Sequence, residues 1–378
     1  MNKSRRKILQ GLLSSTAFSL SGWRMIGQPN QAGAGISSSG PNGLRAHAAA
    51  HDLLVGSAVV IGQVRSDAAY RALLQDQANI LVADWQMKWN VLRPAPNKFN
   101  FSDADWLVAY ALQNQQKFRG HNLCWHEALP SWFAGYANSG NARGLLTHHI
   151  QTVVGHYAGK IQSWDVVNEA VLPSDGRPDG LRNSPWLKLV GKDYIDLAYS
   201  TARQADPKAL LTYNEFALEP ENSEGQRKRD AVLNLLQGMK SRGIPIDAVG
   251  LQSHLGTYKA TYGPGVLQFV RDVAKLGLRV FITELDVDDG KVPGTDTERD
   301  GAVASVYSGY LGMLLPEPNV DVLITWELRD SDSWMKTGLP PRPDHTPRRP
   351  LPFDSNGEAK PAFLSMRNAI DRCGMKSS

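Results

Sequence analysis

The chain has 378 residues, 42% of them hydrophobic, a length that suits one large α/β domain and is too great for a minimal binding module. Six of its 41 basic residues precede residue 51, so 35 basic and 37 acidic residues remain and the formal net charge of that part is −2. The basic excess therefore belongs to the N-terminal segment. The rest of the chain carries no charge pattern for binding nucleic acid or anionic lipid.

Residues 1–50 are predicted to be an export signal with a flexible approach to its cleavage site. This segment contains no acidic residue, carries the pair Arg5-Arg6, continues with an apolar stretch over residues 8–20 and ends near Ala46-His47-Ala48. These features are typical of a cleaved signal, and the arginine pair is typical of the bacterial twin-arginine type. The stretch is too polar for a transmembrane helix. We expect a protein exported to the periplasm or the medium, without membrane contact after cleavage; a disordered cytoplasmic tail is the alternative.

Residues 51–378 are predicted to form one catalytic domain, a (β/α)8 or TIM barrel. Nearly continuous apolar or β-branched runs alternate with helix-like segments, as expected when helices cover a parallel sheet. The strand-like runs are 53–61, 79–88, 117–126, 161–169, 210–216, 247–254, 279–286 and 320–328. The helix-like segments include 67–77, 103–115, 194–204, 226–242, 264–275 and 297–314. Gly56 and Gly62 are isolated and give no phosphate-binding fingerprint, which disfavours a nucleotide-binding fold.

Polar and aromatic side chains gather where five of the predicted strands end. They are His121, Trp125 and His126, then Asn168 and Glu169, then Gln252 and His254, then Glu284 and Asp286, and finally Trp326 and Glu327. Because the carboxyl ends of parallel strands meet at one mouth of a barrel, we expect these side chains to converge. Indoles for stacking and polar groups for binding hydroxyls suit a carbohydrate better than a phosphate or a hydrophobic ligand.

Two glutamates of this set are predicted to act as an acid and a nucleophile. Side chains alternate along a strand, so Gln252 shares a face with His254, and Glu284 shares one with Asp286. His254 can then contact Glu284 while Asp286 fixes the network, which would keep Glu284 ionised as a nucleophile requires. Glu169 follows an amide and has fewer evident cationic partners, so it could keep its proton and serve as the acid.

Each of these residues also has a purely structural interpretation. A glutamate at a strand end can be a helix cap or a surface ion pair, and Trp125, Trp326 and Trp334 can be packing residues. The histidines could bind a metal, but the chain has no His-x-His or His-Glu-x-x-His pattern. We expect neither a metal nor a cofactor. Trp164 is predicted to lie in the core, Cys124 to be a small buried hydrophobe, and the two cysteines to be isolated thiols.

In combination, the motifs resemble glycoside hydrolase family 10, a group of (β/α)8 xylanases. The resemblance runs over about residues 53–363, and the order of its motifs makes it highly specific. The motifs are Met87-Lys88-Trp89, Gly120 to His126, Trp164 to Glu169, Gln252-Ser253-His254-Leu255, Ile282 to Asp286, Asp330 to Trp334, Pro350 to Asp354 and Lys360-Pro361.

The resemblance implies a role for each matching residue. Glu169 would be the acid/base and Glu284 the nucleophile. Asn168 would bind the sugar 2-hydroxyl, and His254 would hold Glu284 with support from Asp286. The residues implied to line the sugar site next to the cut are Lys88, His121, Trp125, Gln252, Trp326 and Trp334.

Three places depart from the family pattern. Asp84-Trp85 stands where the family usually has Glu-Asn, Glu127-Ala128 stands where it has Ser-Gln, and Glu327 replaces a usual Gly. The first two places are implied to hold the second sugar on the non-reducing side, so Asp84 and Trp85 are expected at the substrate. Trp85 exchanges hydrogen bonds, each worth about 1 kcal/mol net, for a stacking surface. The chemistry is expected to be retained, and the preferred chain, its branching and the cutting pattern are left open.

We therefore expect an exported, metal-independent, retaining endo-1,4-β-xylanase that binds xylan and acts as a monomer. Two alternatives remain. One is the same machinery directed at another β-glycan or working as a transglycosylase, and the other is a non-catalytic sugar-binding protein.

Overall fold

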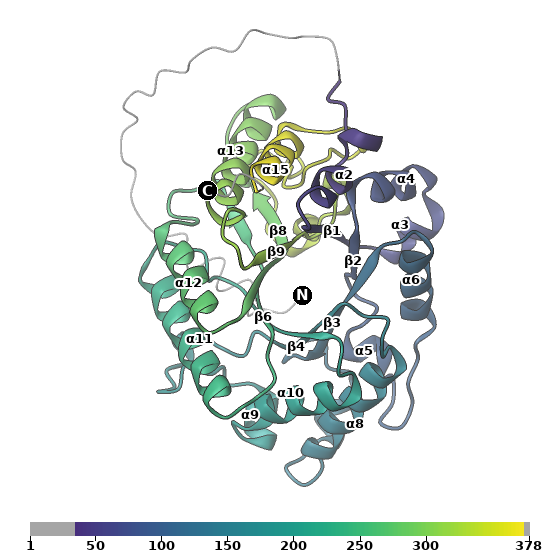
Figure 1. Ribbon diagram of the computed structural model, residues 1–378, viewed down its shortest axis with the longest axis vertical. Helices are drawn as coiled ribbons and strands as arrows, with labels where there is room; N and C mark the ends of the chain where they lie inside the picture. Colours follow the sequence, from purple (N-terminus) through teal and green to yellow (C-terminus); the bar gives the residue numbers. More distant parts are fainter. Residues whose placement is uncertain (1–34, 374–378) are drawn as a thin grey trace.

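A closed barrel of parallel strands forms the centre of the molecule, and helices surround it (Figure 1). The computed structural model describes residues 35–373. The barrel strands are β1 (Leu54–Val59), β2 (Ile80–Ala83), β3 (Lys117–Cys124), β4 (Ser163–Asn168), β5 (Leu210–Glu215), β6 (Ala248–Leu251), β8 (Arg279–Asp288) and β9 (Val320–Thr325). Each pairs in parallel with its neighbours, and the ring closes because β1 pairs with β9 and β6 with β8. The predicted (β/α)8 barrel is confirmed.

The helices begin and end at recognisable signals. The Asp67 side chain accepts a hydrogen bond from the Tyr70 backbone at the start of α4, and Thr295 opens α13 with a capping box. Gly243 and Gly277 lie just beyond α11 and α12 with φ of +70° and +72°, a conformation that glycine adopts without strain. The longer helices are α4 (Ala68–Gln77), α6 (Ser102–Gln113), α8 (Ala142–His156), α10 (Tyr194–Ala205), α11 (Ser223–Ser241), α12 (Pro264–Lys275), α13 (Asp296–Leu314) and α15 (Pro361–Arg372).

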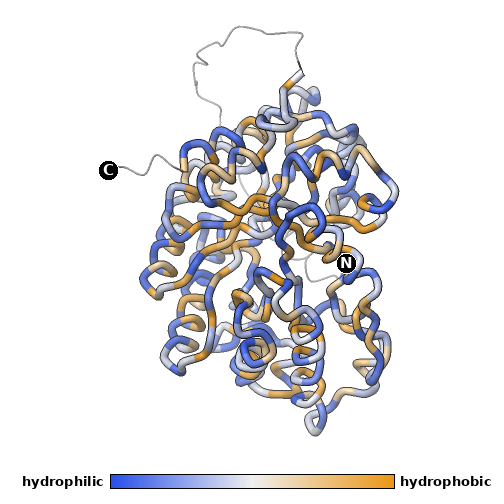
Figure 2. Tube along the Cα trace, turned by 45° about the vertical axis from the view of Figure 1, so that its right-hand side comes forward, coloured by the Kyte–Doolittle hydropathy of each residue, from blue (hydrophilic) through white to orange (hydrophobic). Residues whose placement is uncertain are grey.

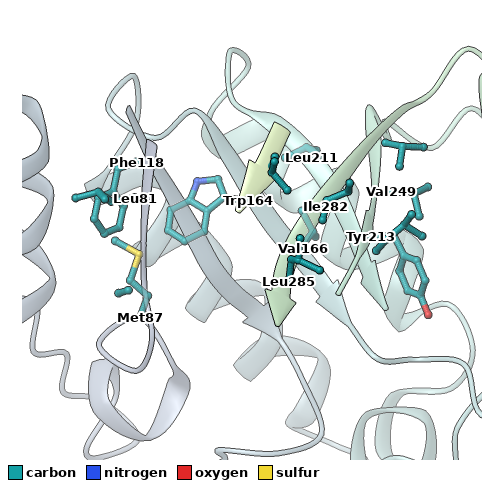
Figure 3. Packing of buried hydrophobic residues seen from close by; sticks show 14 of the residues in the cluster. Leu81, Met87, Phe118, Trp164, Val166, Leu211, Tyr213, Val249, Ile282 and Leu285 are labelled. Atoms are coloured by element: carbon teal, nitrogen blue, oxygen red, sulfur yellow. The ribbon is translucent and has the colours of Figure 1, made fainter. Parts of the chain in front are cut away.

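The hydrophobic core has two parts. The larger lies between the barrel and the helices and includes Leu81, Phe118, Trp164 and Val166 (Figure 3). The smaller consists of side chains such as Ile80 and Phe281, which alternate with the first set along the strands. Figure 2 shows hydrophobic residues along the central strands and mixed colours along the outer helices. Trp164 is fully buried, which confirms its predicted place in the core.

Gly120 shows how tightly neighbouring strands pack, and the two cysteines lie in different parts of the fold. A Cβ atom on Gly120 would lie 2.0 Å from the Trp164 ring, so only glycine fits there. Cys124 is buried, as the sequence predicted, and Cys373 is half-buried; among residues 35–373 no disulfide is formed.

The predicted domain boundary at residue 50 needs correction. Helix α2 (Leu44–Ala49) packs against α4, α15 and β1, with Leu44 and Ala48 buried. The Gln77 side chain accepts a hydrogen bond from the Leu44 backbone, so the small residues expected at the cleavage site lie inside a packed helix. The barrel domain therefore begins before Leu44. The Arg5-Arg6 pair and the apolar stretch lie outside the described residues. Within residues 35–373, no helix combines the length and the apolar character needed to cross a membrane.

Candidate active site

The polar side chains predicted at the strand ends come together at one mouth of the barrel. Asn168 is the last residue of β4, and Glu169 follows it directly. Glu284 and Asp286 lie on β8, and His254 opens the short strand β7 (His254–Gly256), which pairs with β8 beside Asp286. The two glutamate side chains are 99% buried, so this mouth holds carboxyl groups largely removed from water.

Asn214, on β5, joins the two glutamates through hydrogen bonds. Its Nδ2 donates to Asn168 Oδ1 at 2.9 Å and to Glu284 Oε1 at 2.8 Å. The Thr283 hydroxyl donates to Asn214 Oδ1 at 2.7 Å and fixes the orientation of the amide. Asn168 Nδ2 in turn donates to Glu169 Oε1 at 3.3 Å. Asn214 could not be assigned from the sequence, because its position between β4 and β8 follows from the order of strands in the closed barrel.

The carboxyl group of Glu169 lies among amide groups. Gln252 Nε2 donates to Glu169 Oε1 at 3.1 Å, close to the bond from Asn168. The backbone of Glu169 is left-handed, with φ of +57°, and it is held at both polar atoms. Its N–H donates to the Asn214 carbonyl, and its carbonyl accepts from Arg182 Nε at 2.8 Å. This conformation turns the side chain into the mouth, where it can reach a bound substrate.

The carboxyl group of Glu284 lies beside an imidazole. His254 Nε2 is 3.1 Å from Glu284 Oε2, and His254 Nδ1 is 2.9 Å from Asp286 Oδ1. The contact predicted from strand alternation is therefore present. Trp334 Nε1 donates to the other Asp286 oxygen at 2.6 Å, which holds the aspartate from its far side.

Electrostatics favour a protonated histidine in this network. Burial lowers the pKa of His254, but the charges and hydrogen bonds of Asp286 and Glu284 outweigh burial and raise it from 6.5 to about 10. Burial also raises the pKa of Asp286, against the opposing effect of His254. The imidazolium therefore stays charged at neutral pH and places a positive charge next to Glu284.

A pocket of about 410 Å³ opens beside this network and contains most of the remaining predicted residues. It is lined by Asp84, Trp85, Lys88, His121, Trp125, His126, Glu127, Ala128, Leu129, Trp326 and Trp334. The Lys88 ammonium lies 4.3 Å from the centre of the Trp85 ring, 5.4 Å from that of Trp125 and 5.8 Å from that of Trp326. Asp84 Oδ1 is 4.0 Å from the same ammonium. Flat apolar faces and charged hydrogen-bonding groups thus share one pocket, as carbohydrate binding requires.

Two further groups, which the sequence did not predict, hold site residues in place. His121 Nδ1 is 2.9 Å from Asp165 Oδ2, and Arg119 pairs with the other oxygen of that aspartate. The Glu219 carboxylate accepts the Ser253 N–H at 2.9 Å, at the left-handed residue just before His254. Charged residues inside apolar strand runs, such as Arg119 and Asp165, are a sequence signal for such support, because a buried charge needs a partner.

The predicted histidines have carboxylate neighbours instead of a metal-binding arrangement. Among residues 35–373, no group of three or more His, Cys, Asp and Glu side chains could hold a metal ion. His121 faces Asp165, and His254 faces two carboxylates.

A (β/α)8 barrel whose mouth holds two glutamates in unlike environments, next to a pocket walled by indoles, has the arrangement expected of a glycoside hydrolase. Comparison with known proteins gives the family. Residues 43–369 match the model of glycosyl hydrolase family 10, and the chain belongs to this family.

Individual relatives match this chain over most of their length. The chain is 32% identical over 305 residues to endo-1,4-beta-xylanase B of Thermotoga neapolitana, covering 80% of this chain and 83% of the relative. It is 35% identical over 308 residues to a beta-1,4-xylanase of Dictyoglomus thermophilum, covering 78% and 82%. The crystal structure of xylanase 10B from Thermotoga petrophila in complex with xylobiose superposes with a TM-score of 0.79 at 29% identity, covering 90% of this chain and 99% of that one.

Proposed function

We propose that this protein is a retaining endo-1,4-β-xylanase, with Glu284 as the nucleophile and Glu169 as the acid/base. The observation that carries the proposal is the difference between the two carboxyl environments. Glu284 contacts a His254 ring shared with Asp286, whereas Glu169 receives hydrogen bonds from the amides of Gln252 and Asn168. Two carboxyl groups with distinct neighbours are suited to two distinct roles.

The first half of the reaction forms a covalent glycosyl-enzyme. Glu284 attacks the anomeric carbon while the bond to the departing glycosidic oxygen breaks and Glu169 gives that oxygen its proton. The positive charge on His254 favours the ionised form of Glu284 before the attack. Asn168 is placed by Asn214 at the same mouth, where its amide can bind the sugar 2-hydroxyl as the transition state develops.

The second half returns the enzyme to its starting state. Glu169, now a carboxylate, takes a proton from a water molecule, and the resulting hydroxide attacks the anomeric carbon and releases Glu284. Two inversions at the same carbon give a product with the configuration of the substrate.

The substrate class follows from the pocket and from the relatives. Trp326 and Trp334 wall the pocket, and Lys88 and His121 offer polar groups to sugar hydroxyls. The similar proteins are named xylanases, and one was solved with xylobiose. Xylan is therefore the substrate that we propose for this chain.

Export is a separate proposal that rests on the sequence of the leader. Because helix α2 packs on the barrel, cleavage after Ala48 would remove buried residues. The sequence Ala32-Gly33-Ala34 offers a small-residue exit upstream of that helix. Mass spectrometry of the protein recovered from the periplasm or the medium should give an N-terminus that precedes Leu44. Recovery of the uncleaved chain from the cytoplasm would contradict export.

The decisive test of the function combines a substrate panel with product stereochemistry. Release of reducing sugar should be fastest on xylan, compared with mixed-linkage glucan and cellulose. NMR of the first product should show the β-anomer before mutarotation. An initial α-anomer would refute the retaining mechanism, faster cleavage of glucan would favour a related β-glycanase, and no cleavage of any of the three would favour a sugar-binding protein.

A further inference from the structure

Glu327 occupies a position that is unfavourable for glutamate in two ways. It follows Trp326 at the end of β9, and its backbone is left-handed, with φ of +67°. A side chain with a Cβ is strained there, because the left-handed region favours glycine. The side chain is also 1% exposed, which removes a carboxyl group from water.

The surroundings of Glu327 make its ionised form still less favourable. Burial raises the pKa of its carboxyl well above the usual range, and the nearby negative charges of Asp84 and Asp286 act in the same direction. A hydrogen bond from the Trp334 backbone and the positive charge of His254 oppose this rise in pKa without reversing it. A residue with a strained backbone and a buried carboxyl group near other negative charges needs a stabilising contact elsewhere.

That contact is with Trp334, whose backbone N–H donates to Glu327 Oε2 at 3.2 Å. Trp334 lies between the short helices η3 (Asp330–Asp332) and α14 (Met335–Gly338), in the loop that follows β9. Its indole N–H bonds Asp286, and its ring meets the His254 ring edge-on at a centroid distance of 5.2 Å. The Trp334 carbonyl also accepts hydrogen bonds from the Thr337 and Gly338 backbones of α14. Glu327 adds to these contacts by accepting the Trp334 N–H on the side that faces the site.

The held indole forms a wall of the substrate pocket. Trp334 lines the pocket together with Lys88 and His121, and it touches the His254 and Asp286 pair that supports Glu284. Under the proposed function, a sugar bonded to Glu284 would lie against this wall, because Trp334 contacts the His254 ring that in turn contacts Glu284. Loss of the Glu327 acceptor would leave the Trp334 backbone held through its carbonyl alone and would widen the range of positions that the indole samples.

We infer that Glu327 is a positioning residue that fixes Trp334 against the sugar attacked by Glu284, so that backbone strain at residue 327 is retained for substrate affinity. This inference rests on the proposed function, because the sugar is the proposed substrate. Glu327 acts through Trp334 and touches no reacting atom.

The test is Glu327→Gly, which removes the strain and the acceptor together. We expect KM for an aryl β-xylobioside to rise about three- to tenfold, the effect of one lost hydrogen bond, with a melting temperature equal to or above that of the wild type. Glu327→Gln keeps an acceptor oxygen at the same place and should restore KM to within twofold. An unchanged KM in Glu327→Gly, or a raised KM that comes with a lower melting temperature, would overturn the inference.

Two further variants separate positioning from general effects. Gln115 is also left-handed, with φ of +55°, but it lies just before β3 at the opposite end of the barrel. Gln115→Gly should therefore relieve similar strain and leave KM unchanged. Adding Glu327→Gly to the Trp334→Ala variant should change KM by less than twofold, because the indole that Glu327 holds is already absent. If the two substitutions raise KM by independent factors, Glu327 does not act through Trp334. If the wild type has no xylanase activity, which would refute the proposed function, the same ratios are taken from dissociation constants for xylobiose measured by calorimetry. An equal dissociation constant in the wild type and in Glu327→Gly would then refute this inference.

Discussion

The two sides of the barrel mouth hold chemically identical carboxyl groups in different surroundings. On the β8 side, Glu284 contacts an imidazole that also binds Asp286, and Trp334 anchors that aspartate. On the β4 side, amide groups from Gln252 and Asn168 reach Glu169. The difference teaches that, in the proposed mechanism, the roles of nucleophile and acid follow from the neighbours of each glutamate and not from the glutamates themselves.

The two sides are also connected. Asn214 donates to Glu284 and to the oxygen of Asn168, so one amide sets the orientation of groups on both sides. Substitutions on the β4 side can therefore be compared with substitutions on the β8 side and with substitution of Asn214, which links the two sides.

Removing the two carboxyl groups should give the largest and most distinct effects. Glu284→Ala should lower kcat on xylan and on aryl xylobiosides by on the order of 10⁴-fold or more, because neither substrate can form the covalent intermediate. Glu169→Ala should lower kcat on xylan by about 10²- to 10⁴-fold. It should largely spare glycosylation by aryl glycosides with acidic leaving groups, which need little protonation.

The measurement is kcat/KM for both variants on both substrates. Glu284→Gln and Glu169→Gln are the matched controls, since they keep the shape of the side chain and remove its acid–base chemistry. Equal losses on the two substrates for both alanine variants would contradict the assignment of roles.

His254→Asn tests the ionic character of the β8 side through pH. The folded-state pKa of His254 is raised from 6.5 to about 10, so the protonated ring stabilises the fold fully below pH 6.5, and this contribution is lost as pH rises through 10. The unfolding free energy of the wild type should exceed that of the variant by on the order of a few kcal/mol near pH 6, and the gap should narrow toward pH 10. Urea unfolding at several pH values measures it. A gap independent of pH would mean that the ring is not charged in the folded protein.

Asn214→Ala breaks the link between the two sides. Loss of a hydrogen bond to a charged group costs about 1.5–3 kcal/mol, so kcat/KM should fall by about 10- to 150-fold on both xylan and aryl xylobiosides. Asn214→Gln, which keeps the amide but misplaces it, is the comparison. A loss confined to xylan would show that Asn214 serves the Glu169 side alone.

Trp85→Ala should have the smallest effect, because Trp85 lies at the rim of the pocket. Its ring is 41% exposed and lies over the Lys88 ammonium, a contact worth about 0.5–1 kcal/mol at an exposed site. KM for xylotriose should rise by no more than about fivefold, with kcat retained. Tyr136→Ala, which removes an aromatic ring that is 45% exposed and does not line this pocket, is the control. A lower KM in Trp85→Ala would show that the indole obstructs the pocket.

Much of the β8 side could be predicted from the sequence. Alternation along a strand put Glu284 and Asp286 on one face, and both contact His254 in the structure. The barrel itself followed from the repeat of apolar runs and helical segments. Both inferences depend on local periodicity, which a single strand or helix imposes on its own residues.

The groups around Glu169, and the hydrogen bonds of Asn214 that link the two sides, were harder to predict from the sequence. Asn214 lies on a strand between the two glutamates, and its partners come from β4 and β8. Arg119 and Asp165 meet because β3 and β4 pair, and α2 belongs to the domain because it packs on α15 at the other end of the chain. None of these contacts has a sequence spacing that could predict it.

The sequence by itself determined the eight-fold repeat, the strand ends that carry the chemistry, and the two glutamates, because these depend on residue type and short-range periodicity. Only the tertiary structure decided which groups surround each glutamate, where the domain begins, and what the strained Glu327 holds. Those features depend on barrel closure and on strand register, which bring together residues that are far apart along the chain.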